Sequence, residues 1–268
     1  MDVSEVVLES GLQLSYAERG DPSGPTVMLL PGPTDSWLSY RQFIGSLPMS
    51  IRAIAVSQRG HGDSTKPPSG YRVEDFAADI PPLLAALHIE RAVLAGHSGS
   101  CLVARRVALD RPELVSGLVL EASPTTLRDH DGLKRFVQET VADLEDPIDH
   151  HLARSVIADT SSDAVRPELV DQLVEELLKV PARAWKEMFA GLLEYDDVED
   201  LNRLAAPTVL VWGDADTIVP RSMQDELARS IPEAALLVYH GVGHTPRWEV
   251  PSRFAADVTA FVERVSRS

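Results

Sequence analysis

The sequence predicts an α/β fold, in which a mostly parallel central sheet carries helices on both faces and an all-helical segment is inserted. Short apolar runs bounded by Gly or Pro alternate with helical patterns through residues 1–123 and again through 205–268. Such alternation indicates βαβ units and a parallel sheet. Residues 124–204 contain helical patterns and no convincing strand. A chain of 268 residues is long enough to bury a large core without disulfides.

The strands of the core are expected from the N-terminus onward. Residues 5–14, broken at Gly11, predict a hairpin. Short apolar runs that end at turn residues predict further strands at 26–30, 51–56, 91–96, 115–120, 208–212 and 235–239. Core helices are expected at 73–87, 99–110 and 251–265. Pro81 and Pro82 are expected to kink the first of these helices, because proline removes a backbone donor.

The inserted segment has its own pattern. Apolar residues at helical spacing predict amphipathic helices at 133–144, 169–177 and 184–192, with Pro167 and Pro181 at the start of the last two. The chain is therefore expected to consist of a core, formed by residues 1–123 and 205–268, and a helical cap at 124–204.

Charge and composition exclude several classes of partner. The chain has 25 basic against 41 acidic residues and a formal net charge of −16. Such a surface repels phosphate backbones and anionic lipid, so we expect a small-molecule substrate and neither nucleic acid nor a membrane as partner. A single cysteine, Cys101, excludes an internal disulfide. The N-terminus shows no secretory signal, which favours a cytoplasmic protein. A homodimer is compatible with the sequence.

The most informative motif lies between an expected strand and an expected helix. Residues 96–100 read Gly-His-Ser-Gly-Ser, which is close to G-x-S-x-G. In that motif a serine occupies a turn so tight that only small residues fit two positions before and after it. Ser98 would stand at a helix N-terminus, where the helix dipole favours a developing anion. The departure is Ser100, which replaces the final glycine.

With this motif the chain resembles the α/β-hydrolase superfamily, as a serine-nucleophile member with a helical cap. Four other segments carry the resemblance in the expected order. They are Pro-Gly-Pro-Thr-Asp-Ser-Trp at 31–37, Gln-Arg-Gly-His-Gly-Asp-Ser at 58–64, Gly-Asp-Ala-Asp at 213–216 and Gly-Val-Gly-His at 241–244. The resemblance covers nearly the whole chain and implies a triad of Ser98, Asp216 and His244.

The base and the acid of this triad are chosen among several candidates. His244 follows a strand and lies between Gly243 and Thr245, in a loop that can present its ring to the serine. A histidine suits proton transfer because it changes charge near neutral pH. His97, next to the serine in sequence, is expected to point away from it, and His61 is expected to be structural.

For the carboxylate that orients the base, the resemblance favours Asp216. Asp214 and Glu121 stay open as alternatives, because Asp214 is in the same loop and Glu121 ends a neighbouring strand. The histidines and acids of the cap do not have the spacing of a standard metal site, so neither a metal nor a cofactor is expected.

Acyl transfer also needs two donors aimed at the developing oxyanion. Gly99 is expected to supply one from its backbone. The superfamily takes the other from the position of Pro33, which has no N–H. Either Thr34 donates instead, through its N–H or its hydroxyl, or the second donor is missing.

Aromatic residues are candidates for contact with the substrate. Trp185, Met188, Phe189 and Leu192 form a stripe at helical spacing in the expected cap. The stripe either packs the cap onto the core or lines an apolar substrate pocket. Trp37 is placed near the entrance of that pocket.

Three functions compete at this point. The first is a serine hydrolase that cleaves carboxylic esters or lactones of small, largely apolar substrates through an acyl-enzyme. The second is an oxidoreductase like the cofactor-independent dioxygenases of this fold, in which a His–Asp pair deprotonates the substrate. The third is a ligand-binding or degenerate homologue, which the missing N–H of Pro33 motivates. A probe that acylates an active-site serine separates the first from the others.

Overall fold

The computed structural model describes residues 1–267, and it confirms the α/β fold. Eight strands form one sheet in the order β1-β2-β4-β3-β5-β6-β7-β8. The pairs β1–β2 and β2–β4 are antiparallel, and the remaining neighbours are parallel. The strands are β1 (Asp2–Val7), β2 (Gln13–Arg19), β3 (Thr26–Leu30), β4 (Arg52–Val56), β5 (Ala92–His97), β6 (Val115–Glu121), β7 (Thr208–Gly213) and β8 (Ala235–Tyr239).

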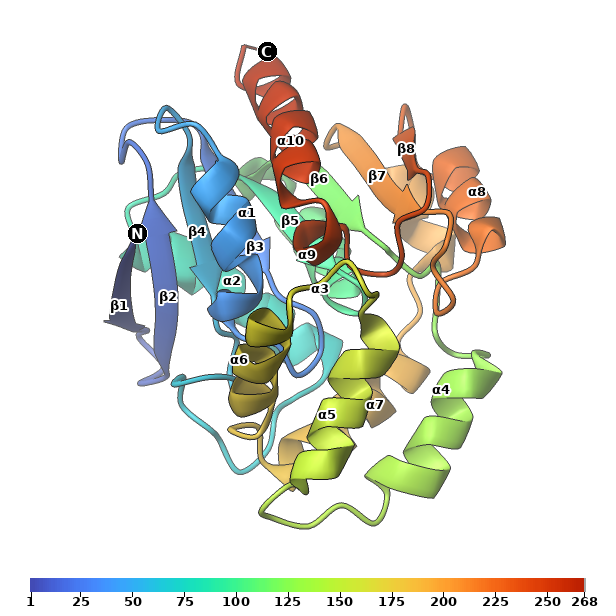
Figure 1. The fold of residues 1–268 in the computed structure, drawn as a ribbon. Helices are drawn as coiled ribbons and strands as arrows, with labels where there is room; N and C mark the ends of the chain where they lie inside the picture. The colour runs from blue at the N-terminus through green and yellow to red at the C-terminus, as the bar shows by residue number, and fades with distance from the viewer. Residues whose placement is uncertain (268) are drawn as a thin grey trace.

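Helices cover both faces of the sheet, because its strands alternate apolar side chains between two cores. Met28, Leu94 and Leu120 face one core, whereas Leu29, Val93 and Val119 face the other. The first core is closed by α2 (Val73–Ala86), α3 (Ser100–Asp110) and α8 (Arg221–Ser230). The second is closed by α1 (Arg41–Ser46) and α10 (Pro251–Val265), beside the short α9 (Pro246–Glu249). Figure 1 shows α1, α9 and α10 together in front of the sheet.

Between β6 and β7 the described chain forms helices and loops and no strand. These inserted helices are α4 (Asp131–Phe136), a π-helical turn η3 (Val137–Val141), α5 (His150–Thr160), α6 (Pro167–Leu177) and α7 (Ala182–Glu194), followed by the 3-10 segment η4 (Val198–Arg203). In Figure 1 they gather below the sheet.

The structure contains helices that the sequence patterns did not predict. Pro81 and Pro82 do not interrupt helix α2, whose apolar face is buried against the core. Helices α1 and α9 were not expected from the sequence, and neither were α5 and α8. Each of the last two buries only two side chains, Ala153 and Ile157 in α5 and Gln224 and Leu227 in α8, so neither has a wide apolar stripe.

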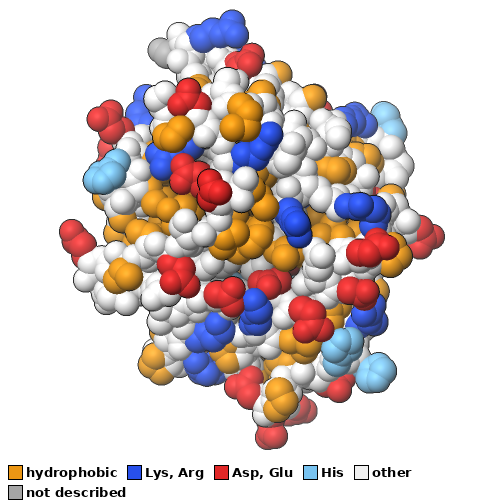
Figure 2. All heavy atoms as spheres, turned by 60° about the vertical axis from the view of Figure 1, so that its left-hand side comes forward, with side chains coloured by type: hydrophobic (Ala, Val, Ile, Leu, Met, Phe, Trp, Pro, Cys, Tyr) orange, Lys and Arg blue, Asp and Glu red, His pale blue; other side chains and the backbone are white. Residues whose placement is uncertain are grey.

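The surface agrees with the charge of the chain. Acidic and basic side chains are interspersed over the face shown in Figure 2, with no continuous basic patch on it. In the described part of the chain, no helix combines the length and the apolar character needed to cross a membrane.

A buried arginine ties both ends of the inserted segment to the core. Arg105, on α3, is fully buried and forms two hydrogen bonds with the Asp197 carboxylate, of 2.6 and 3.1 Å. Asp197 follows α7. The same guanidinium donates to the carbonyl oxygens of Pro124 (3.0 Å) and Thr125 (2.8 Å), which follow β6. One side chain therefore holds the chain where it leaves the core and where it returns.

Replacing Arg105 by Met is expected to lower the free energy of unfolding by about 3–5 kcal/mol, because it leaves the buried Asp197 carboxylate without a counter-charge. The measurement is urea unfolding followed by circular dichroism. Arg106→Met is the matched control, since the adjacent arginine pairs with Asp110 at the surface, where an ion pair contributes less than about 1 kcal/mol. Equal effects of the two substitutions would contradict this assignment.

Candidate active site

The turn between β5 and α3 holds Ser98 in an unusual backbone conformation. Its φ is +52°, in the left-handed region that non-glycine residues rarely adopt. The Ser98 N–H donates to the carbonyl of Glu121 at the end of β6 (2.9 Å), and the Ser98 carbonyl accepts from the N–H of Cys101 (2.9 Å). These two bonds hold the strained turn, which leaves the serine side chain half-buried at the wall of a cavity.

Close packing explains the small residues of this turn. A Cβ on Gly96 would lie 2.6 Å from the carbonyl oxygen of Ser100, and a Cβ on Gly99 would lie 2.9 Å from the ring of Pro33. Ser100 is tolerated because its hydroxyl has partners. It donates to the carbonyl of Pro31 (2.5 Å) and accepts from the amide of Gln58 (3.0 Å). The one departure from the motif, Ser100, is thus held by Pro31 and Gln58.

The predicted base and acid lie in contact. Nδ1 of His244 is 2.9 Å from Oδ2 of Asp216, and both side chains are buried. Oδ1 of Asp216 accepts from the backbone N–H groups of Ile218 (2.8 Å) and Val219 (3.0 Å). The carboxylate is therefore fixed by its own loop, and it holds one tautomer and one orientation of the imidazole.

The two alternative acids have other partners. The Glu121 carboxylate accepts from the N–H of Arg247 (2.8 Å) and the hydroxyl of Tyr40 (3.4 Å). Asp214 lies at the surface and bonds His240 and the N–H of Gly241. Asp216 alone of the three candidates contacts His244.

A further carboxylate, Glu249, holds the loop on both sides of His244. It accepts from the N–H of Gly243 (3.0 and 3.1 Å) and of Thr245 (3.3 Å). It also accepts from the hydroxyl of Ser162, just after α5 (2.6 Å). The sequence analysis missed this role, although an acidic residue shortly after the histidine loop was a signal for it.

His97, which was expected to point away from Ser98, lies against the ring of His244. Its ring is 4.8 Å from that of His244, and its Nε2 donates to the His244 carbonyl (3.1 Å), since a carbonyl only accepts. Burial holds the pKa of His97 well below its usual range, so the ring stays uncharged.

In the segment that was expected to supply an oxyanion donor, residues 31–37, the N–H of Thr34 is already bonded to a neighbouring side chain. Thr34 has a φ of +71°, and its N–H donates to Nε2 of His61 (3.2 Å). Nδ1 of His61 contacts the carbonyl of Arg59 (2.9 Å), which fixes the tautomer. Burial lowers the pKa of His61 to about 4, so the ring remains a neutral acceptor. Among the described residues, neither the Thr34 hydroxyl nor the Gly99 N–H has a hydrogen-bond partner.

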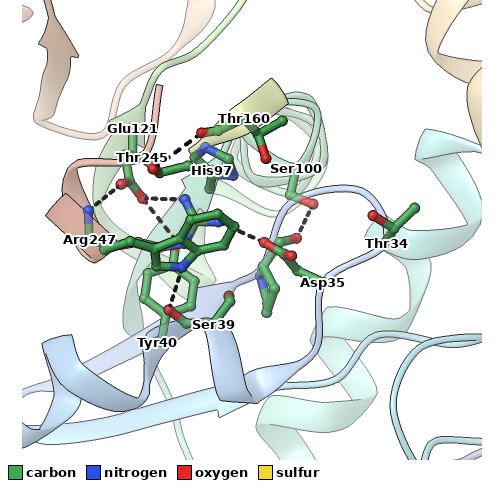
Figure 3. Close-up of polar contacts among 12 residues, drawn as sticks. Thr34, Asp35, Ser39, Tyr40, His97, Ser100, Glu121, Thr160, Thr245 and Arg247 are labelled. Atoms are coloured by element: carbon green, nitrogen blue, oxygen red, sulfur yellow. Dashed lines mark hydrogen bonds and ion pairs between the residues drawn. The ribbon is translucent and has the colours of Figure 1, made fainter. Parts of the chain in front are cut away.

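A buried cation lies behind these groups (Figure 3). The Arg247 guanidinium is fully buried and donates to the Asp35 carboxylate (2.6 Å), and it lies 3.5 Å from that of Glu121. It also stacks over the rings of Tyr40 and Trp248, at 5.4 and 4.4 Å. Two buried carboxylates thus share one cation. Burial raises the pKa of Asp35 to about 6, and it raises the pKa of Glu121.

Ser98, His244, Gly99 and Thr34 line one cavity of about 400 Å³. Most of its other wall is apolar and comes from the inserted helices and neighbouring loops, with Leu127, Leu133, Phe136, Val156, Ile157, Phe189, Leu192, Ile218, Val219 and Trp248.

Of the four residues predicted to contact the substrate, Trp37, Trp185, Met188 and Phe189, only one lines the large cavity. Phe189 lines the large cavity, and Met188 lines a separate small one of about 10 Å³. Trp185 is fully buried and packs against Phe136 and Phe189. Trp37 is half-buried against the second core. Neither tryptophan lines the cavity, because the packing of the inserted helices and of the core takes up both rings.

No group of three or more His, Cys, Asp or Glu side chains in residues 1–267 has the arrangement of a metal site. His130 illustrates this. Its Nδ1 accepts from the N–H of Leu133 (3.0 Å), and its Nε2 contacts the carbonyl of Ile218 (3.1 Å).

Comparison with known proteins finds relatives along nearly the whole chain. The sequence matches a family described as alpha/beta hydrolase fold over residues 25–251. It is 27% identical to the non-heme chloroperoxidase of Streptomyces lividans, over 96% of this chain and 99% of that protein. It is also 27% identical to the 2-(acetamidomethylene)succinate hydrolase of Mesorhizobium japonicum, over 94% of this chain and 92% of that protein. The solved structure of esterase RhEst1 from Rhodococcus sp. ECU1013 is similar with a TM-score of 0.86 and 26% identity, over 99% of this chain and 100% of that one. These relatives support a hydrolase.

The raised pKa of Asp35 predicts a pH dependence of stability. Below about pH 4 the carboxyl is protonated in both the folded and the unfolded state. Between about pH 4 and the folded pKa of about 6, the folded chain keeps a proton that the unfolded chain has released, so stability falls as the pH rises.

Relative to Asp35→Asn, the wild type should therefore lose roughly 1–2 kcal/mol of unfolding free energy between about pH 5 and about pH 7.5. Urea unfolding of both proteins at the two pH values measures this difference. A difference that stays constant, or that grows in favour of the wild type, would show that Asp35 is ionised throughout.

Proposed function

Because the chain belongs to the alpha/beta hydrolase fold family, we propose that it is a serine hydrolase that cleaves carboxylic esters or lactones through an acyl-enzyme. The observation that carries this proposal is the buried contact between His244 and Asp216, beside a cavity whose wall contains both His244 and Ser98 on its strained turn.

Acylation begins when His244 takes the hydroxyl proton of Ser98. The serine oxygen then forms a bond to the substrate carbonyl carbon, and the carbonyl electron pair moves to its oxygen. Asp216 holds the imidazole in the required tautomer and stabilises the imidazolium that results. Cys101 does not compete as a nucleophile, because burial raises the pKa of its thiol to about 12.

The tetrahedral intermediate then collapses. Its oxygen re-forms the carbonyl, and the leaving alkoxide takes the proton from His244. With a lactone, this alcohol remains attached to the acyl group. Water then gives a proton to His244 and attacks the acyl-enzyme, and the Ser98 oxygen recovers the proton as the carboxylic acid leaves.

The oxyanion donors in this proposal are the Gly99 N–H and the Thr34 hydroxyl. Pro33 has no N–H, and the Thr34 N–H is bonded to His61. The Thr34 hydroxyl has no protein partner among the described residues and lines the same cavity as Ser98. A hydroxyl rotates, so it can follow the charge as it develops on the substrate oxygen.

The cavity supports a small, largely apolar substrate. Its volume of about 400 Å³ and its apolar wall suit the acyl or alcohol part of such an ester. The loss of backbone donors also favours an oxidoreductase without acylation, or a binding protein. A fluorophosphonate probe separates these functions from hydrolysis, since only hydrolysis needs a serine that is acylated.

Ser98→Ala is expected to lower kcat on an aryl ester by at least ~10⁴-fold and to abolish labelling by the probe. Asp216→Asn should lower kcat by about 10⁴-fold, because the imidazole loses its tautomer. Asp214→Asn is the matched control and should change kcat less than about twofold, since Asp214 faces solvent. Hydrolysis by Ser98→Ala at the wild-type rate would exclude the acyl-enzyme.

Thr34→Val is expected to lower kcat by ~10²–10³-fold with little change in KM, because it removes an oxyanion donor and keeps the shape of the side chain. Thr34→Ser should restore most of the rate. Initial rates over a range of substrate concentrations separate kcat from KM. If Thr34→Val were harmless, the hydroxyl would not be the donor.

A further inference from the structure

Apart from histidines, the only ionisable side chains among the described residues of the cavity wall are carboxylates. Of the residues that line it, Asp35 and Asp159 are acidic, and no described Lys or Arg is among them. Among the described residues of its wall, no Lys or Arg is therefore placed to form an ion pair with an anionic substrate.

The two carboxylates differ in how they are paired. Asp35 is buried and bonded to Arg247, which offsets its charge. Asp159 lies in the last turn of α5, is exposed, and makes no hydrogen bond or ion pair with any described residue. The next residue, Thr160, accepts from the hydroxyl of Thr245 (3.3 Å), which places this end of α5 beside His244.

Two basic residues near the cavity, Arg128 and Lys134, have partners elsewhere. Arg128 pairs with Asp196 (3.1 Å), and Lys134 pairs with Asp129 (3.0 Å). His130 does line the cavity, but its Nδ1 accepts from the N–H of Leu133 and its Nε2 contacts the carbonyl of Ile218, so both ring nitrogens have protein partners. The charge of Asp159 is therefore not balanced within the cavity.

We infer that Asp159 is a specificity-determining residue that excludes substrates with a carboxylate and accepts substrates with an ammonium group. This inference rests on the proposed function and names its substrate class: esters or lactones that are uncharged, or that carry a cationic group beyond the apolar part. A carboxylate that enters this cavity loses water, finds no cation and meets a like charge. An ammonium group at the same depth gains a partner.

The experiment compares three 4-nitrophenyl esters of matched length, namely the hexanoate, the monoester of adipate and the 6-(trimethylammonio)hexanoate. For the wild type, kcat/KM on the anionic ester should be at least about tenfold below that on the hexanoate, and the cationic ester should equal or exceed the hexanoate. Asp159→Asn should raise the anionic-to-neutral ratio by about 3–10-fold. Added salt should shrink the wild-type difference, because Asp159 is exposed.

Asp163→Asn is the matched control. Asp163 is exposed, has no partner among the described residues and lies outside the cavity wall, so the same change of net charge should leave all three ratios unaltered. An unchanged ratio in Asp159→Asn, or an equal shift in both variants, overturns the inference. Preference of the wild type for the adipate ester overturns it as well and leaves the proposed function intact. Turnover of the hexanoate that does not depend on Ser98 would instead overturn the proposed function.

Discussion

The site depends on one buried cation. Arg247 lies in α9, just after the histidine loop, and connects it to two distant segments. Its guanidinium pairs with Asp35 after β3, and both its guanidinium and its backbone N–H contact the Glu121 carboxylate at the end of β6. Glu121 also accepts the N–H of Ser98 on its carbonyl oxygen. Glu121 therefore bonds both the serine turn, through its carbonyl oxygen, and the segment after the histidine loop, through its carboxylate. Loss of the guanidinium would leave two carboxylates buried without a counter-charge, which is among the most costly changes in a protein interior.

Burial also sets the charge of the histidines around the base. His61 and His97 both have lowered pKa values because they are desolvated, and both serve as neutral hydrogen-bonding groups. His61 uses its bare nitrogen to accept from Thr34, and His97 uses its N–H to hold the carbonyl of His244. The two rings therefore fix the oxyanion segment and the histidine loop without adding a positive charge beside the serine.

Most of the core could be predicted from the sequence, because buried parallel strands are short apolar runs that end at Gly or Pro. The contact of Asp216 with His244 followed from the chain order of the motifs. Helix α5 could not be found, since it buries only Ala153 and Ile157. The use of the Thr34 N–H by His61 depends on a contact between distant segments that no local pattern records.

The aromatic residues of α7 show that the sequence also could not predict how deeply a side chain is buried. Trp185 and Phe189 are four residues apart and therefore on one side of α7, yet the first is fully buried and the second lines the cavity. Periodicity assigns a face to a side chain but not a depth. Phe136, on α4, packs against both rings, so contacts from another helix and not periodicity set how deep each ring lies.

The Glu249 carboxylate limits which inserted segments this core can accept. It bonds both neighbours of His244 and also Ser162, which belongs to the segment between β6 and β7. The inserted helices are consequently not an interchangeable module laid over a finished core. An insertion taken from another protein would have to bring a hydroxyl to the same carboxylate, or the loop of the base would lose one of its supports. Ser162 and residues 243–249 therefore form one structural unit, although they lie in different segments of the chain.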